Sequence, residues 1–445
     1  MTLALRPSSR RSRSALCLSA ALVMVLTGCG SYFGEEEVPL EGTRIPVRRA
    51  DPGAQQEFKG TARIPAARRV ADWAQAGGAS VRTSRNIEGD LALDELWSSS
   101  IGAGSDDEAR IVATPVIAGE TLVALDAAAT LTALDRTSGD ERWELDLTPE
   151  DEDGRDGFGG GLAISKGLVI AASGFGRIHG VDLASGEEKW VYQAPAPIRA
   201  APALSEGVAV AVTRNGIVIG LDAATGEQRW RFSGMDGGAG MLSGAAPAIA
   251  GEVVAIPFST GDIMVARLRD GRRGWNESLG ARKGGSAMSL ISDVSSSPVI
   301  EQGRIYAGTI SGRVAAFEVQ SGRRLWARDL GLYNPIWAAG ETLFMVTDTG
   351  ALVALRSDSG RTIWQTQLPQ YDDPEERRGA FAYGGPIMVG GKLYLTSSDG
   401  VLFEVDAATG EKLRELDIPS STVPPISAGG VLYVLDENGT VHAFR

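Results

Sequence analysis

Residues 133–143 read Ala-Leu-Asp-Arg-Thr-Ser-Gly-Asp-Glu-Arg-Trp, and the pattern returns at 180–190 and at 220–230. In each stretch an acidic residue is followed by glycine four positions later and by tryptophan after four more. The seven copies of this spacing are Asp135-Gly139-Trp143, Asp182-Gly186-Trp190, Asp222-Gly226-Trp230, Arg267-Gly271-Trp275, Glu318-Gly322-Trp326, Arg356-Gly360-Trp364 and Asp406-Gly410-Arg414. Three copies lose the acid or the tryptophan, but all keep the glycine, which identifies an internal repeat.

This spacing predicts a tight turn between two strands. Glycine supplies the positive φ that such a turn requires, and an aspartate at the end of the first strand can bind turn amides through its side chain. The tryptophan then lies on the next strand, on a face that two-residue alternation fixes. A flat indole in that position can cover the seam between neighbouring sheets and bury a large apolar area.

The length of the repeat predicts propeller blades. Successive tryptophans are 47 residues apart between Trp143 and Trp190, and 40 apart between Trp190 and Trp230. Repeats of about 40 to 50 residues with four short strands are typical of β-propellers. A ring of this kind accounts for 445 residues as a signal, a tether and one closed domain.

The two ends of the repeat region indicate how the ring closes. The last repeat, 425–444, stops after its third strand and has no tryptophan strand. A matching strand lies in 93–97, whose Trp97 precedes Trp143 by 46 residues. We therefore predict an all-β fold, an eight-bladed β-propeller closed by an N-terminal strand in the last blade, which leaves no exposed sheet edge.

The first residues are typical of a bacterial lipoprotein signal. A basic start is followed by an apolar run, 15–26, that is too short to span a bilayer. It ends in Leu-Thr-Gly-Cys, which places a lipidated cysteine at Cys29. We predict a signal peptide over 1–28, the lipidated Cys29 and a flexible tether over 29–70, and the propeller over 71–445.

Charge and cysteine content narrow the possible partners. Loss of residues 1–28 removes four arginines and moves the formal charge from −13 to −17. A body this acidic argues against nucleic acid and anionic lipid as direct ligands, so membrane attachment is assigned to the acyl chains. The only cysteines, Cys17 and Cys29, fall in the targeting region, and no disulfide is expected to support the fold.

Signals for catalysis, cofactors and metals are weak. The two histidines, His179 and His442, occupy matching strand positions, and two isolated histidines do not make a usual zinc site. The stretch 151–157 resembles a calcium loop, but Arg155 falls where an oxygen ligand is needed. We therefore assign no catalytic residue, no cofactor and no metal, and interpret 151–157 as a solvated acidic loop.

Two long connections between repeats, 233–246 and 280–297, are the candidate partner-binding segments. They flank one irregular repeat, and they place Met241, Leu242, Leu290 and Ile291 in Gly- and Ser-rich sequence. Apolar residues in such loops indicate a protein-binding patch or a segment that folds back over the sheet ends, and the sequence leaves both open.

The repeat resembles the pyrroloquinoline-quinone-type propeller superfamily. The lipoprotein signal, the stretch Asp-Trp-Ala-Gln-Ala-Gly-Gly at 72–78 and the run 291–299 together resemble the BamB family. That resemblance implies a non-enzymatic scaffold of the outer-membrane β-barrel assembly (BAM) machinery. It implies docking on the periplasmic POTRA domains of the barrel subunit BamA, with Met241, Leu242 and Asp293 at the contact. This chain lacks the family's frequent arginine in 233–246 and a second acid at Ser295.

The same resemblance implies a place on the periplasmic face of the outer membrane, because Gly30 rather than Asp follows the lipidated cysteine. It also implies a single copy within a hetero-complex, with unfolded outer-membrane proteins as further possible partners. Two alternatives stay open. One is a quinoprotein dehydrogenase, a class that usually has adjacent cysteines, absent here from the propeller. The other is an envelope propeller that binds another protein or a glycan.

Overall fold

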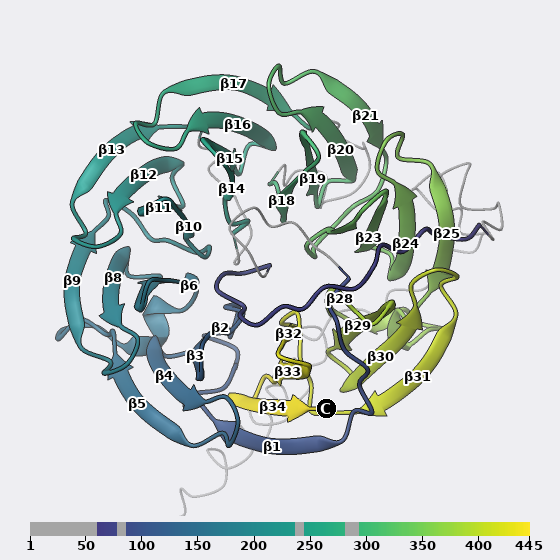
Figure 1. The fold of residues 1–445 in the computed structure, drawn as a ribbon, viewed down its shortest axis with the longest axis horizontal. Helices are drawn as coiled ribbons and strands as arrows, with labels where there is room; N and C mark the ends of the chain where they lie inside the picture. The colour runs from purple at the N-terminus through teal and green to yellow at the C-terminus, as the bar shows by residue number, and fades with distance from the viewer. Residues whose placement is uncertain (1–59, 78–85, 236–243, 281–292) are drawn as a thin grey trace, which may run out of the picture. The chain divides into compact units, whose positions relative to one another are not determined.

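The computed structural model describes residues 60–77, 86–235, 244–280 and 293–445. Within these residues the chain forms eight four-stranded antiparallel sheets arranged as blades around a ring (Figure 1). The predicted all-β, eight-bladed propeller is therefore confirmed. No helix in this part of the chain is long and apolar enough to cross a membrane.

Each blade runs outward from a short inner strand to an outer strand at the rim. Blades 1–4 are β2 (Val116–Ala118), β3 (Thr121–Leu125), β4 (Thr130–Asp135) and β5 (Glu141–Asp146); β6 (Gly161–Ser165), β7 (Leu168–Ala172), β8 (Arg177–Asp182) and β9 (Glu188–Gln193); β10 (Ala203–Ser205), β11 (Val208–Val212), β12 (Ile217–Asp222) and β13 (Gln228–Ser233); and β14 (Ala248–Ala250), β15 (Val253–Pro257), β16 (Asp262–Arg267) and β17 (Arg273–Ser278).

Blades 5–8 are β18 (Ser296–Glu301), β19 (Arg304–Thr309), β20 (Arg313–Glu318) and β21 (Arg324–Arg328); β22 (Trp337–Ala339), β23 (Thr342–Val346), β24 (Ala351–Arg356) and β25 (Thr362–Gln367); β28 (Tyr383–Val389), β29 (Lys392–Ser397), β30 (Val401–Asp406) and β31 (Lys412–Asp417); and β32 (Ile426–Ala428), β33 (Val431–Leu435), β34 (Thr440–Phe444) and β1 (Glu95–Ser100). A 3-10 helix, η1 (Gly154–Gly157), lies between blades 1 and 2, and a hairpin of β26 (Tyr371–Asp373) and β27 (Arg378–Ala380) lies between blades 6 and 7.

The repeated turn has the chemistry that its sequence predicts. Asp135 Oδ1 accepts hydrogen bonds from the amides of Thr137 (2.8 Å) and Ser138 (3.1 Å), while Gly139 adopts a φ of 79°. The Arg142 guanidinium, with these amides, lowers the pKa of the Asp135 carboxyl to about 2. The turn is thus held by its own aspartate, and the glycine takes a backbone conformation that other residues adopt only with strain.

In seven of the eight blades, a tryptophan of the outer strand packs on the turn glycine of the next blade. The indole of Trp143 lies against Gly186, and its Nε1 donates to the carbonyl of Leu183 at 2.9 Å. A Cβ added at Gly186 would lie 2.7 Å from the Trp143 ring, so this contact requires glycine. The same pairing recurs at seven blade junctions, which are Trp97 on Gly139, Trp143 on Gly186, Trp190 on Gly226, Trp230 on Gly271, Trp275 on Gly322, Trp326 on Gly360 and Trp364 on Gly410.

Ring closure joins the N-terminal strand to the last blade. Strand β1 pairs antiparallel with β34, with Trp97 opposite Ala443. The amides and carbonyls of Asp94 and Arg445 extend this ladder with two reciprocal bonds of 2.9 Å. Blade 8 therefore contains both ends of the propeller sequence, in the arrangement that its missing fourth strand predicts (Figure 1).

The junction between blades 7 and 8 differs from the other seven. Its tryptophan position is Arg414, and blade 8 has no turn between its third and outer strands because these come from opposite ends of the chain. The Arg414 guanidinium instead donates to the carbonyls of Ala92 (2.7 Å) and Leu91 (3.2 Å), just before β1. It also pairs with the buried Glu404 at 2.7 Å. The loss of tryptophan in the seventh copy thus follows from closure.

Residues 60–77, which we name the strap, lie on the propeller. The amide of Gly60 donates to the carbonyl of Ile363 (2.9 Å), and the amide of Ala62 donates to that of Ala408 (2.8 Å). The prediction extended the tether to residue 70, but contacts with the blades begin at Gly60. Polar composition and prolines suggested a spacer, whereas backbone hydrogen bonds to blades 6 and 7 are not visible in such a pattern.

Candidate functional site

The two faces of the ring are distinguished by the inner strands, which all run in the same direction. Connections from an outer strand to the next inner strand lie on one face, which we name the funnel face. Turns that follow the inner strands lie on the other, the strap face. The strap contacts these turns, since the amide of Gly119 donates to Asp72 Oδ1 and the amide of Gly429 donates to the carbonyl of Val70, both at 2.9 Å.

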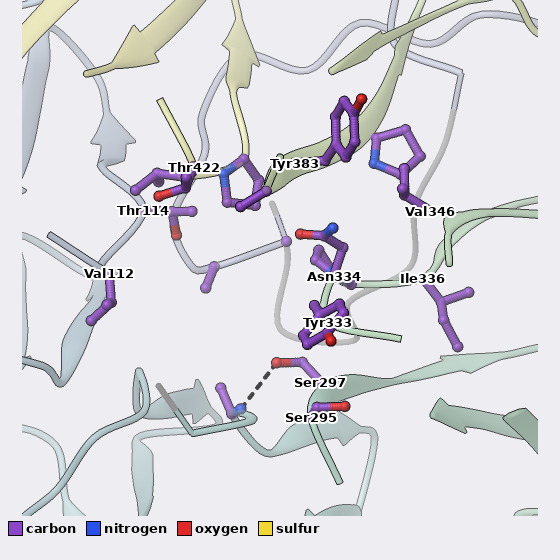
Figure 2. Close-up of a pocket in the computed structure, with 18 of the residues that line it drawn as sticks. Val112, Thr114, Ser295, Ser297, Tyr333, Asn334, Ile336, Val346, Tyr383 and Thr422 are labelled. Atoms are coloured by element: carbon purple, nitrogen blue, oxygen red, sulfur yellow. Dashed lines mark hydrogen bonds between the residues drawn. The ribbon is translucent and has the colours of Figure 1, made fainter. Parts of the chain in front are cut away.

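A central cavity of about 540 Å³, the funnel, is lined largely by residues that precede the inner strands. Its walls are aromatic, proline-rich and small polar, and Figure 2 shows Tyr333, Asn334, Tyr383 and Thr422 among them. Tyr333 is 43% exposed, while Asn334 beside it is buried. Such a cavity, mostly apolar with few polar groups, is the usual form of a binding site.

The strap forms part of the funnel floor. Trp73 stacks on Trp337 with ring centroids 6.2 Å apart and planes at 11°, and the two side chains are only 2% and 4% exposed. Trp73 exchanges backbone hydrogen bonds of 2.9 and 2.8 Å with Ile117 of β2. In Figure 1 the strap, in dark purple, crosses the centre of the ring.

The next residues of the strap continue this pairing around the inner strands. The carbonyl of Ala74 accepts from the amide of Ile164 in β6 at 2.7 Å. The Gln75 side chain then forms the pair of hydrogen bonds that a neighbouring strand's backbone would form. Its amide donates to the carbonyl of Leu204 (2.8 Å), and its oxygen accepts from the Leu204 amide (2.9 Å). The sequence Trp-Ala-Gln at 73–75 is therefore fitted to three successive inner strands.

A smaller cavity of about 70 Å³ adjoins the funnel between blades 3 and 4. Arg199, Ala200 and Gly244 line both cavities, whereas Arg214 and Asp293 line only the smaller one. Arg199 lies in the connection from β9 to β10, with its guanidinium 5.2 Å from the centroid of the Phe158 ring. Burial, together with the charge of Arg214, lowers the pKa of the Arg199 guanidinium.

The structure describes one of the three predicted partner-binding residues. Met241 and Leu242 lie outside the described residues. Asp293 is described and only 8% exposed, so it is a buried carboxylate at the wall of the small cavity. The neighbouring connections do meet at this face, because the amide of Ala246 donates to Ser297 Oγ at 3.0 Å (Figure 2). Cys29 also lies outside the described residues.

The two histidines occupy matching strand positions, but their pKa values shift in opposite directions. Nδ1 of His179 lies 2.7 Å from Glu188 Oε2, but burial dominates and lowers the pKa of this histidine. His442 lies between Asp436 Oδ2 (3.1 Å) and Glu95 Oε1 (2.8 Å). Burial opposes its protonation, yet the hydrogen bonds to both carboxylates outweigh burial and raise its pKa.

Neither histidine belongs to a metal-binding cluster within the described residues, where no three His, Cys, Asp or Glu side chains are placed to hold an ion. The acidic stretch 151–157 contains η1, whose cap is Asp153 Oδ1, the acceptor of the Arg155 amide at 3.0 Å. The Arg155 side chain pairs with Asp106. This stretch connects β5 to β6 and therefore lies on the funnel face.

The sequence did not predict two features of the site. In the sequence analysis, the stretch 72–78 supported only the family resemblance. A tryptophan and a glutamine in an otherwise spacer-like segment could also have indicated that it is buried. Arg199 carries no such signal, because its place between two cavities depends on Gly244, which is 45 residues away in sequence.

Comparison with known proteins gives a consistent family. The family described as outer membrane protein assembly factor BamB matches residues 89–157, 127–366 and 349–445. The chain is 33% identical to outer membrane protein assembly factor BamB of Xanthomonas campestris pv. campestris, over 81% of this chain and 87% of that protein. It is 29% identical to that of Escherichia coli K12, over 80% and 90%.

Solved structures share the fold at low sequence identity. BamB from Moraxella catarrhalis aligns with a TM-score of 0.66 at 17% identity, over 80% of this chain and all of that chain. Quinohemoprotein alcohol dehydrogenase from Comamonas testosteroni aligns with a TM-score of 0.67 at 15% identity, over 85% and 81%. At these identities the similarity concerns the propeller alone and does not separate a scaffold from an enzyme.

Proposed function

This chain belongs to the BamB family of outer membrane protein assembly factors, and we propose that it is a non-enzymatic scaffold that docks on the periplasmic POTRA domains of the barrel subunit BamA through its funnel face. The observation that carries the proposal is the funnel itself. Aromatic, proline and small polar side chains from the inter-blade connections converge there, and such surfaces suit protein partners.

Asp293, and Gly244 near the expected Met241 and Leu242 contact, line the cavities of the funnel face. Gly244, which follows Met241 and Leu242 in sequence, lines both cavities, and Asp293 lines the smaller one. We propose that Met241 and Leu242 supply apolar anchors to the interface. Because Asp293 is buried, its role there is to shape the wall of the small cavity and not to act as an exposed charge.

We further propose that Cys29 is lipidated and holds the chain at the periplasmic side of the outer membrane. The described chain enters the propeller at Gly60 on the strap face, opposite the funnel. Thirty residues separate Cys29 from Gly60, and a fully extended chain of that length spans about 100 Å. A Cys29→Ser chain should leave the membrane fraction and carry no lipid by mass spectrometry.

The alternative with a specific observation behind it is a quinoprotein dehydrogenase, because those enzymes share this propeller. The sequence disfavours it, since the only cysteines are Cys17 and Cys29 and none lies in the propeller. Addition of pyrroloquinoline quinone and calcium to the purified chain should leave its melting temperature unchanged, and the spectrum of the mixture should equal the sum of the spectra of the free quinone and the protein. A saturable, calcium-dependent quinone spectrum would favour the enzyme.

Isolation of the lipidated chain in mild detergent tests the scaffold proposal. The barrel subunit should co-purify in a stoichiometric amount, and a Leu242→Glu chain should recover less of it. A matched Leu413→Glu chain, altered on the exposed outer strand β31, should recover the same amount as wild type. Recovery of a different envelope protein or of a glycan in place of the barrel subunit would support the other scaffold interpretation.

A further inference from the structure

We propose that Arg199 and Arg214, at the crevice where the two cavities meet, bind a carboxylate that the docking partner inserts. This inference rests on the proposed docking function and names the chemistry of one contact within it. The partner we infer is a protein segment that carries an Asp or Glu side chain next to an apolar or aromatic side chain.

The first support is the charge balance of the crevice. The chain has a formal charge of −13, yet the charged residues of the small cavity are Arg199, Arg214 and Asp293, which leave one net positive charge. In the funnel, the charged lining residues among those described are Arg199 and Asp348, from different blades. The described lining of the small cavity therefore carries one net positive charge in a protein that is acidic as a whole.

The second support is that neither arginine is neutralised by the part of the chain that the structure describes. Some arginines of the repeated turns have carboxylate partners, as in the pairs Arg142–Asp135 and Arg229–Asp222, both at 2.6 Å. Arg199 and Arg214 form no ion pair among the described residues, although both lie in a protein with an excess of acids. Two arginines close enough to interact without a shared anion repel each other.

The third support is the burial of Arg199. Its side chain is half-buried, its Nε is fully buried without a hydrogen-bond acceptor among the described residues, and its guanidinium lies over the Phe158 ring. Partial burial of an unpaired charge costs free energy that a bound carboxylate would recover, because a guanidinium can hold both carboxylate oxygens at once. The lowered pKa of Arg199 agrees with this uncompensated charge.

The surroundings define the rest of the ligand. Ala200 and Gly244 leave space beside Arg199, while Val212, Pro257 and Phe258 give the small cavity an apolar wall. An acidic side chain alone would leave this apolar wall uncovered. A segment with an apolar residue next to the acid would cover it. A free inorganic anion would use the charge and leave the apolar wall in contact with water.

The test compares two double variants in the full-length, lipidated chain with the complete barrel subunit in detergent. Arg199→Gln/Arg214→Gln should weaken binding at least about tenfold and should flatten the dependence of affinity on salt. The matched control is Arg272→Gln/Arg361→Gln, two exposed arginines in turns of the strap face without ion pairs among the described residues. Its affinity should stay within about twofold of wild type.

Melting temperatures separate binding from folding. Since Arg199 is a partly buried charge without a carboxylate partner among the described residues, its replacement by Gln should not lower the melting temperature, and Arg199→Lys should retain part of the binding. If wild type does not bind the barrel subunit, the proposed function fails. If wild type binds but the Arg199→Gln/Arg214→Gln chain keeps wild-type affinity and salt dependence, the docking function stands and the arginine crevice is wrong.

Discussion

Seven blade junctions use the same device, and the eighth does not. At seven of them an indole from one blade covers the turn glycine of the next, whereas between blades 7 and 8 Arg414 binds the carbonyls of Leu91 and Ala92. The seven contacts join residues about 40 apart, but the eighth joins residues more than 300 apart. Repeated junctions are thus encoded locally, while closure requires a different interaction between the two ends of the propeller.

The largest effect should come from removal of the closing strand. A chain that starts at residue 101 lacks the strap and β1, which exposes the edge of β34 and removes the contact of Trp97 with Gly139 of blade 1. We expect it to lose cooperative folding, at a cost of more than about 4 kcal/mol in the free energy of unfolding. A chain that starts at residue 60 keeps every described contact and should match wild type in urea denaturation. Equal stability of the two truncations would exclude closure by β1.

The glycine junctions can be tested with a matched pair. Gly186 and Gly167 both have positive φ, 72° and 77°, but a Cβ at Gly186 meets the Trp143 ring at 2.7 Å, while nothing lies within 4 Å of one at Gly167. Gly167→Ala should cost about 1–2 kcal/mol from the backbone alone, and Gly186→Ala about 1–3 kcal/mol more. If both variants have the same denaturation midpoint, the indole does not depend on the glycine.

The exceptional junction predicts an intermediate effect. Arg414→Met removes two hydrogen bonds to the segment before β1 and one partner of the buried Glu404, which keeps Lys392 at 2.8 Å. We expect a loss of about 2–3 kcal/mol in the free energy of unfolding. Arg414→Trp should not restore stability, because no turn glycine faces this position. A tryptophan variant as stable as wild type would show that closure uses the same device as the other junctions.

The matching histidines predict the smallest effects, with opposite signs. Since the folded state raises the pKa of His442, its stabilisation is present below the unfolded pKa near 6.5 and is lost as pH rises through the folded pKa. The lowered pKa of His179 means that stability falls as pH drops below about 6.5.

Denaturation curves between pH 5 and 8 should therefore show different trends for the two variants. Relative to wild type, His442→Gln should lose up to about 1 kcal/mol at the acid end, and His179→Gln should gain at that end. Parallel pH profiles for both variants and wild type would contradict the roles of Glu95 and Asp436 around His442.

The rim of the propeller was predictable from sequence, and most of the site was not. The spacing of Asp135, Gly139 and Trp143 identifies a turn and a seam because both depend on neighbours within one repeat. The missing tryptophan strand after 425–444 likewise identified β1. The strap could not be predicted in this way, because Trp73, Ala74 and Gln75 bind the inner strands of three successive blades, which are distant from the strap in sequence. The Arg199 crevice depends on the same long-range assembly.

Site-specific photo-crosslinking in the intact cell envelope can show whether the chain docks through its funnel face. The crosslinking residue is placed at Tyr333, an exposed side chain in the funnel wall, or at Leu413, a side chain with similar exposure (47%) on the outer strand of blade 7. We predict that the Tyr333 position crosslinks to the barrel subunit and that the Leu413 position does not. A barrel-subunit crosslink from Leu413, with none from Tyr333, would place the docking surface at the rim and contradict the account.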